Sequence, residues 1–194
     1  MTEKTPKEKM LSGEAYSCVD AELNALRMQS RQLCKAFNDC RPEESEKKGE
    51  ILRKLLNVEA IGFDIGEPIT FDYGFLTHIG HDVFINHNAT FNDNGGITIG
   101  DYTMIGPNCS FYTAVHPLDA ESRVYSLPTD TEKWERALPI TIGKRCWLGG
   151  NVVVLPGVTI GDDAVIGAGS VVTHDIPGGM VAVGNPCRVI KPVK

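Results

Sequence analysis

A six-residue repeat constrains the fold of this chain more than any other feature of its sequence. Between Ile142 and Pro177 the sequence divides into six successive hexads, and each begins with Ile, Leu or Val. The fifth residue of each hexad is small or aliphatic: Cys146, Val152, Val158, Ala164, Ser170 and Ile176. A fixed period of this length is typical of a parallel β-helix, in which each hexad supplies one short strand and one turn. We therefore expect the aliphatic residues of coils stacked about 4.8 Å apart to form one continuous core.

The same period starts less regularly near Ile69 and is interrupted once. It stops after Phe111, is absent from residues 113–139, and returns at Ile140. A loop of that length inside a regular solenoid is usually functional. The hexads indicate the left-handed β-helix superfamily. We therefore predict an all-β solenoid, a left-handed parallel β-helix of about five coils with one long excursion loop.

Residues 1–57 differ from the rest of the chain in composition and predict an α-helical cap. They are rich in charged residues, Leu and Ala and contain only two glycines. Two helices are indicated: one capped by Asp20 with an apolar face at Leu23, Leu26, Leu33 and Phe37, and one starting at Pro42 with Ile51, Leu52, Leu55 and Leu56. Such a cap covers the apolar end and unpaired strand edges of the first coil. We divide the chain into this cap, residues 1–57, and a β-helix, residues 58–194, with a C-terminal tail at 178–194.

Composition and charge narrow the classes of function. The net charge of −6 argues against nucleic acid or an anionic membrane surface as a partner. No apolar run reaches the roughly 18 residues that span a bilayer, and the first ten residues lack the apolar region of a secretory signal. The six cysteines show no C-x-x-C spacing, so we interpret them as free thiols. These features predict a cytoplasmic protein.

Several segments outside the core positions carry a more specific signature. They include Met10-Leu-Ser-Gly-Glu-Ala-Tyr16, Phe111-Tyr-Thr-Ala-Val-His-Pro117, Trp147-Leu-Gly-Gly150 and Gly184-Asn-Pro-Cys-Arg188. Together they resemble the maltose/galactoside O-acetyltransferases, and the resemblance covers nearly the whole chain. It implies transfer of an acetyl group from acetyl-CoA to a sugar hydroxyl by a homotrimer whose sites lie between subunits.

His116 is the residue that this resemblance implies as the catalytic base. An alcohol is a poor nucleophile until its proton leaves, and an imidazole accepts such a proton near neutral pH. Pro117 restricts residue 116 to extended backbone and so fixes how the ring is presented. No serine or cysteine looks like a covalent nucleophile, since Cys109 occupies an inward hexad position. We therefore expect direct attack of the acceptor on acetyl-CoA in a ternary complex.

The resemblance also implies a set of acceptor contacts. Asn86 matches an active-site asparagine whose amide binds the acceptor or stabilises the developing oxyanion. Asp72 and Asp93 match positions that contact acceptor hydroxyls. For each of the three, the alternative interpretation is a residue that stabilises a turn and does not contact the acceptor. An acidic residue is further expected near the acceptor at the amino end, where Cys18 occupies one candidate position and Asp20 the other.

The donor positions follow the glycine-rich coils. The residues that match the coenzyme A groove of the family are Trp147, Gly149, Gly150, Ala168, Thr173 and Arg188. Arg188 suits the phosphates of the nucleotide end. The family commonly has Lys at the position of His174, so this chain lacks a fixed positive charge there.

Three further histidines, His78, His81 and His87, invite comparison with the zinc site of the γ-class carbonic anhydrases. That site uses an H-x4-H pair, whereas position 121 here is Glu. We therefore expect these histidines at a surface or interface and no metal. Two other functions stay open: a xenobiotic acetyltransferase built on the same coil, and a non-catalytic β-helix that mediates assembly.

Overall fold

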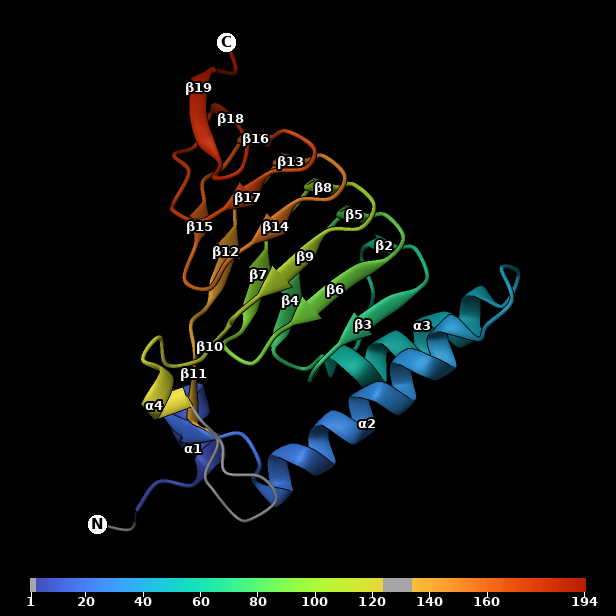
Figure 1. Ribbon diagram of the computed structural model, residues 1–194. Helices are drawn as coiled ribbons and strands as arrows, with labels where there is room; N and C mark the ends of the chain where they lie inside the picture. The colour runs from blue at the N-terminus through green and yellow to red at the C-terminus, as the bar shows by residue number, and fades with distance from the viewer. Residues whose placement is uncertain (1–2, 124–133) are drawn as a thin grey trace.

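The computed structural model describes residues 3–123 and 134–194, and three sheets of parallel strands form the faces of a triangular coil (Figure 1). The first face contains β2 (Asp64–Ile65), β5 (Phe84–Ile85), β8 (Met104–Ile105), β13 (Trp147–Leu148), β16 (Val165–Ile166) and β18 (Met180–Val183). The second face contains β3 (Ile69–Phe71), β6 (Ala89–Asn92), β9 (Ser110–Tyr112), β14 (Val153–Val154) and β17 (Val171–Val172). The third face contains β4 (Thr77–Ile79), β7 (Ile97–Ile99), β12 (Ile140–Ile142) and β15 (Thr159–Ile160).

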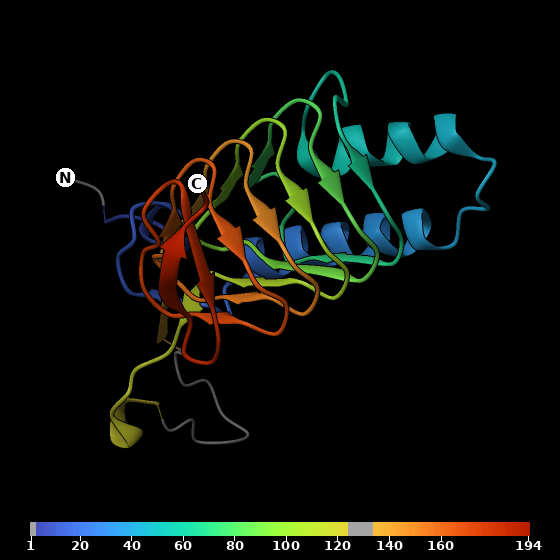
Figure 2. The ribbon, with the colours of Figure 1, turned by 90° about the horizontal axis from the view of Figure 1, so that it is seen from above.

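Strands of the three faces follow one another along the chain, so each set of three makes one coil. The last coil closes where Ile176 bridges Ile160 on the third face. Figure 2 shows the coils stacked along one axis, from the capped end to the hairpin of β18 and β19 (Arg188–Pro192). The predicted left-handed parallel β-helix of about five coils is confirmed.

The interior of the coil is built by the hexad positions that the sequence assigned to it. The first and fifth residues of all six regular hexads are at most 4% exposed. Three phenylalanines stack inside the second face, with ring centroids 4.3 Å apart for Phe71 and Phe91 and 5.1 Å apart for Phe91 and Phe111. Burial of these aliphatic and aromatic side chains is the main stabilising contribution of a solenoid core. The six cysteines all lie among the described residues, and no two of them are joined by a disulfide.

Three N-terminal helices precede the coil: α1 (Pro6–Leu11), α2 (Ala21–Asn38) and α3 (Ser45–Leu56). Helix α2 begins at the predicted cap, where Asp20 Oδ1 accepts from Leu23 N at 3.0 Å, and α2 and α3 lie beside the first coil (Figure 1). The expected start of the second helix at Pro42 is wrong. Glu44 Oε2 accepts instead from Arg41 N at 2.8 Å, and this bond belongs to a turn that precedes α3.

The excursion leaves the third coil between its second and third faces, within the predicted range 113–139. It contains β10 (Ala114–Val115), α4 (Ala120–Arg123) and β11 (Trp134–Ala137); residues 124–133 lie outside the described residues. Its two ends meet where Leu138 N donates to Thr113 O at 2.8 Å. Strand β11 pairs antiparallel with β10 and with β1 (Tyr16–Ser17). The amino-terminal segment is therefore joined to the excursion as well as to the first coil.

No helix among residues 3–123 and 134–194 is long and apolar enough to cross a bilayer.

Candidate active site

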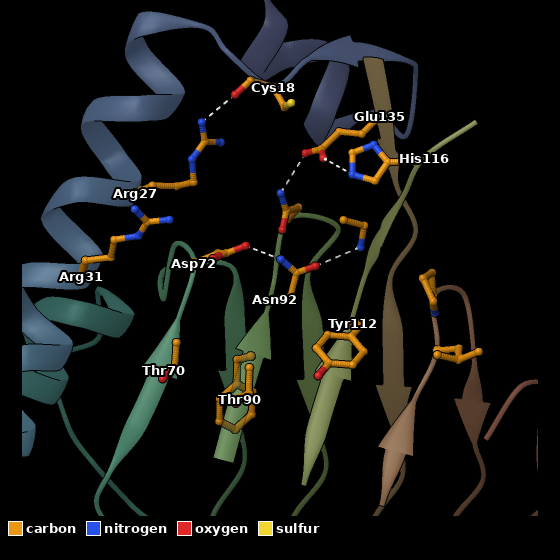
Figure 3. A pocket seen from close by; sticks show the side chains of 15 residues that line it. Cys18, Arg27, Arg31, Thr70, Asp72, Thr90, Asn92, Tyr112, His116 and Glu135 are labelled. Atoms are coloured by element: carbon orange, nitrogen blue, oxygen red, sulfur yellow. Dashed lines mark hydrogen bonds and ion pairs between the residues drawn. The ribbon is translucent and has the colours of Figure 1, made fainter. Parts of the chain in front are cut away.

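A pocket of about 690 Å3 lies over the outer surface of the second face, between α2 and the excursion (Figure 3). Its polar lining comes from the amino-terminal segment, the second-face strands and the excursion: Cys18, Arg27, Arg31, Asp72, Asn92, Tyr112, His116 and Glu135. Three stretches that are distant in the sequence thus meet at one site.

His116 lies just after β10 with its side chain about half exposed. Its Nδ1 is 3.4 Å from the backbone oxygen of Trp134. A carbonyl only accepts, so a hydrogen bond at this contact requires the tautomer of His116 that carries its proton on Nδ1. Nε2 is 3.8 Å from Oε2 of Glu135. The imidazole of His116 therefore lies between the backbone of β11 and the carboxylate of Glu135.

Glu135 is a buried carboxylate, 7% exposed, in the middle strand of the three-stranded excursion sheet. Its Oε1 accepts two hydrogen bonds, one from the hydroxyl of Tyr16 and one from Asn94 Nδ2 at 3.1 Å. Burial, with the adjacent Glu135, raises the pKa of Tyr16 far above its usual range, so that hydroxyl remains a donor. These two donors fix the carboxylate and leave Oε2 directed at His116.

Asp72 reaches this pocket, as predicted, and accepts a hydrogen bond from Asn92 Nδ2 (Figure 3). Burial raises the pKa of Asp72, while the Asn92 hydrogen bond and the charges of Arg27 and Arg31 act in the opposite direction. Arg27 donates to Cys18 O and to the hydroxyl of Tyr73, each at 2.6 Å. Helix α2 thus contributes two guanidinium groups, those of Arg27 and Arg31, to the pocket.

Asp93 does not line the pocket, and its expected contact with the acceptor stays a prediction. Its side chain is fully buried, and its carboxylate accepts from Tyr73 N at 2.8 Å, Gly74 N at 2.9 Å and Thr77 Oγ1 at 3.0 Å. Burial raises the pKa of Asp93 to about 6. Asn94, the next residue, lines the pocket instead, and within the described ranges its buried Oδ1 has no hydrogen-bond partner.

Of the two candidates at the amino end, the structure brings Cys18 to the pocket. Asp20 is occupied as the N-cap of α2 and does not line the pocket. The chain therefore presents a thiol, and no carboxylate, at this part of the acceptor pocket.

Asn86 and His116 lie at different corners of the triangle. Asn86 follows β5, in the turn that leads from the first face to the second, and its Oδ1 accepts from His87 N at 2.8 Å. His116 lies beyond the other edge of the second face. At about 3.3 Å per residue, the strand between these corners separates them by roughly 15–20 Å. A single chain does not bring the two residues together.

The donor candidates form two groups. Trp147 lies on the first face, while Gly149, Gly150 and Ala168 lie in the turns from the first face to the second. A Cβ at Gly149 would lie 2.6 Å from Ala168 N, so close stacking of coils already requires that glycine. His174 and Arg188 line a separate cavity of about 500 Å3. Thr173 Oγ1 is 2.8 Å from His174 Nδ1.

His78, His81 and His87 are exposed on the early coils. Within residues 3–123 and 134–194, no three His, Cys, Asp or Glu side chains are grouped so as to hold a metal ion.

Sequence reasoning missed much of the pocket lining. Glu135 lies in the non-periodic loop, and only its pairing with β1 reveals its place. Tyr16 ends the opening segment of the family resemblance, and no pattern in the sequence indicates that Arg27 and Arg31 face a pocket. The capping box of Thr5 and Glu8 was a readable signal for α1 that was not used.

Comparison with known proteins agrees with this geometry. Residues 9–58 match the maltose acetyltransferase hexapeptide capping motif, and residues 139–174 match the hexapeptide repeat of succinyl-transferase. A maltose O-acetyltransferase from Clostridium difficile 630 has a crystal structure that superimposes with a TM-score of 0.92, at 44% identity over 100% of both chains. The chain belongs to the maltose/galactoside O-acetyltransferase family.

Two further members of similar structure were crystallised with the donor. A galactoside acetyltransferase in complex with coenzyme A is 35% identical, with a TM-score of 0.87 and coverage of 99% of this chain and 92% of that one. A hexapeptide-repeat acetyltransferase from Vibrio cholerae O1 biovar eltor, with acetyl coenzyme A, is 34% identical, with a TM-score of 0.86 and coverage of 98% and 100%. The present protein is thus an acetyltransferase of the maltose/galactoside type, and the reading as a non-catalytic assembly module is set aside.

Proposed function

We propose that this acetyltransferase moves the acetyl group of acetyl-CoA to a hydroxyl of a sugar or glycoside, with His116 as general base. The observation that carries the proposal is the imidazole of His116, which lines the pocket, lies 3.4 Å from the Trp134 carbonyl through Nδ1 and is about half exposed. The pocket volume of about 690 Å3 suits a small polar acceptor. Its carboxylate, amide and guanidinium lining suits hydroxyl groups better than the apolar surface of a typical xenobiotic.

The reaction needs one base and no covalent enzyme intermediate. Nε2 of His116 takes the proton of the acceptor hydroxyl as its oxygen attacks the thioester carbonyl carbon. The new C–O bond forms, the C–S bond breaks, and the imidazolium returns its proton to the departing thiolate sulfur. Cys109 is fully buried in the coil and takes no part.

The donor is proposed to lie along the coils, with the pantetheine arm near Trp147, Gly149, Gly150 and Ala168. Two of the similar structures contain coenzyme A or acetyl-CoA, which supports this donor. The cavity of His174 and Arg188 suits the nucleotide end, where a guanidinium pairs with phosphate. Thr173 positions the imidazole of His174 there.

The complete site is proposed to form between protomers of a homotrimer. Asn86 and His116 lie at different corners of one chain, so a neighbour is needed to place the Asn86 amide beside the reacting carbonyl. The outer surface of the first face supports such packing. Phe84, Met104 and Trp147 lie side by side in register on β5, β8 and β13 and are 42%, 54% and 57% exposed. An exposed apolar column of this kind is typical of an association surface.

Acetylation of a panel of sugars and hydroxylated xenobiotics tests the proposal. Release of free coenzyme A should depend on a sugar or glycoside, and the product should carry one ester-linked acetyl group. Acceptor-dependent release with xenobiotics alone would replace the sugar by the other substrate class. Full turnover by His116→Ala would remove His116 as the base.

A further inference from the structure

We propose that Glu135 binds the acceptor directly, through a hydroxyl that neighbours the one being acetylated, so that the enzyme selects diols. The inference rests on the proposed function and names a structural requirement on its acceptor. It assigns a substrate contact to a residue of the excursion.

The first observation is that only one oxygen of Glu135 is occupied. Oε1 accepts from the Tyr16 hydroxyl and from Asn94 Nδ2, which fixes the carboxylate in its place. Among the described residues, Oε2 has one polar contact, with His116 Nε2 at 3.8 Å. Glu135 also lines the same pocket as His116 (Figure 3). A buried carboxylate oxygen that faces a pocket in this way is a strong acceptor for a ligand hydroxyl.

The second observation is the spacing of the two acceptor atoms. With the proton on Nδ1, Nε2 and Oε2 both carry lone pairs and lie 3.8 Å apart. One hydroxyl has a single proton and satisfies only one of them. Two hydroxyls at normal hydrogen-bond lengths of about 2.7–2.8 Å satisfy both, provided that their oxygens are themselves close together. Hydroxyls on adjacent or next-nearest carbons of a sugar meet that condition.

The two contacts act differently during the reaction. The hydroxyl on Nε2 loses its proton to His116 and attacks the thioester. The hydroxyl that donates to Oε2 keeps its proton, and this hydrogen bond holds the sugar in position for the attack. Once Nε2 is protonated, the ionised Oε2 at 3.8 Å also stabilises the imidazolium, so the same carboxylate serves binding and proton transfer.

The test combines acceptor analogues with a matched pair of variants. kcat/KM is measured for a sugar that serves as acceptor and for its deoxy analogues, each lacking one hydroxyl other than the acetylated one. The enzymes are the wild type, Glu135→Gln and Asp72→Asn. Glutamine keeps an oxygen for Tyr16 and Asn94 and replaces the charged acceptor Oε2 by an amide nitrogen, which only donates. Asp72→Asn makes the same change elsewhere in the pocket.

For the wild type, removal of one neighbouring hydroxyl should lower kcat/KM by about 10- to 100-fold, the loss expected for a hydrogen bond to a charged group. Glu135→Gln should show a similar loss with the parent sugar and less than about a twofold further loss with that analogue. Asp72→Asn should show the full additional loss with the same analogue.

The outcomes separate this inference from the proposed function. If no sugar accepts an acetyl group, the proposed function fails. If sugars are acetylated but the losses from Glu135→Gln and from every deoxy analogue simply multiply, Glu135 acts only on His116 and the inference is overturned. A wild type that is indifferent to every neighbouring hydroxyl overturns it even if Glu135→Gln does not fold.

Discussion

At the scale of single residues, the proposed base of this enzyme is oriented by the backbone as much as by side chains. The Trp134 carbonyl lies 3.4 Å from Nδ1 of His116, and the next residue, Glu135, supplies the carboxylate that faces Nε2. Both groups come from β11 and both bear on one imidazole. Removal of the imidazole ring therefore removes the proposed base and leaves the Trp134 carbonyl and Glu135 in place.

His116→Ala should lower kcat by about 10²- to 10⁴-fold, because general-base catalysis contributes about that much. Affinity for acetyl-CoA should change little, since the residues proposed for the donor lie elsewhere on the coil. Steady-state kinetics and calorimetric titration with coenzyme A measure the two quantities. Lost donor binding with unchanged turnover would show that His116 serves the donor.

The burial of Asp93 can be tested through the pH dependence of stability. Burial raises its pKa to about 6, from about 3.8 in an unfolded chain. The folded state therefore holds this proton more tightly, and the associated stability is present below about pH 4 and is lost as pH rises through 6. At about 1.4 kcal/mol per unit, the change is about 2–3 kcal/mol.

Asp93→Asn cannot titrate, so its urea unfolding supplies the reference. The advantage of the wild type over Asp93→Asn in free energy of unfolding should shrink by that amount between pH 4 and pH 7. A difference between wild type and Asp93→Asn that is independent of pH contradicts the argument.

At the scale of elements, the coil was predictable and the pocket was only partly so. Hexad positions repeat locally, so the inward residues from Ile142 to Ile176 follow from the period alone. The period slips after Phe91, and there the sequence does not tell which side chain turns inward. In the structure Asp93 is buried and Asn94 lines the pocket, and the slipped period does not predict this placement.

The pairing of strands that are distant in the sequence is the other feature that the sequence does not predict. Strand β1 meets β11 across 119 residues, and neither segment carries a periodic pattern. The expected division at residue 57 stays a prediction, yet the segment before it supplies Cys18, Arg27 and Arg31 to the pocket lining and Tyr16 to the carboxylate of Glu135. Contacts of this kind depend on the folded chain as a whole.

Removal of residues 1–17, which include α1 and β1, should separate activity from folding. Turnover should fall at least about 100-fold, since Glu135 loses the Tyr16 hydroxyl and β11 loses its partner strand β1. The β-helix should retain its circular dichroism and cooperative melting, because its core cluster contains none of these residues.

Tyr16→Phe is the matched milder change, because it keeps β1 and the ring and removes one donor. We expect a loss of roughly tenfold, on the scale of one hydrogen bond to a charged group. A truncated enzyme of normal turnover would limit β1 to a structural role.

At the scale of the whole molecule, the separation of Asn86 from His116 predicts an active site shared between chains. Light scattering should give a mass of about 63 kDa, three times the 21.1 kDa of one chain. His116→Ala and Asn86→Ala should each be nearly inactive alone.

Co-expression of these two variants should restore about a quarter of wild-type activity, because random mixing leaves that share of interfaces with both residues intact. Co-expression of the double variant with wild type controls for expression level. No recovery from the mixture, or a stable monomer of full activity, rules out the shared site.

The pairing of β1 with β11 also sets an order of events during synthesis. Tyr16 leaves the ribosome 119 residues before Glu135. At about 5–20 residues per second, it waits roughly 6–24 s for its partner strand. During that interval the first two coils can already stack on α2 and α3, so the nascent chain is a capped solenoid before it is an enzyme. The candidate pocket therefore forms late in translation. It is complete only after β11 has paired with β1 near the amino terminus.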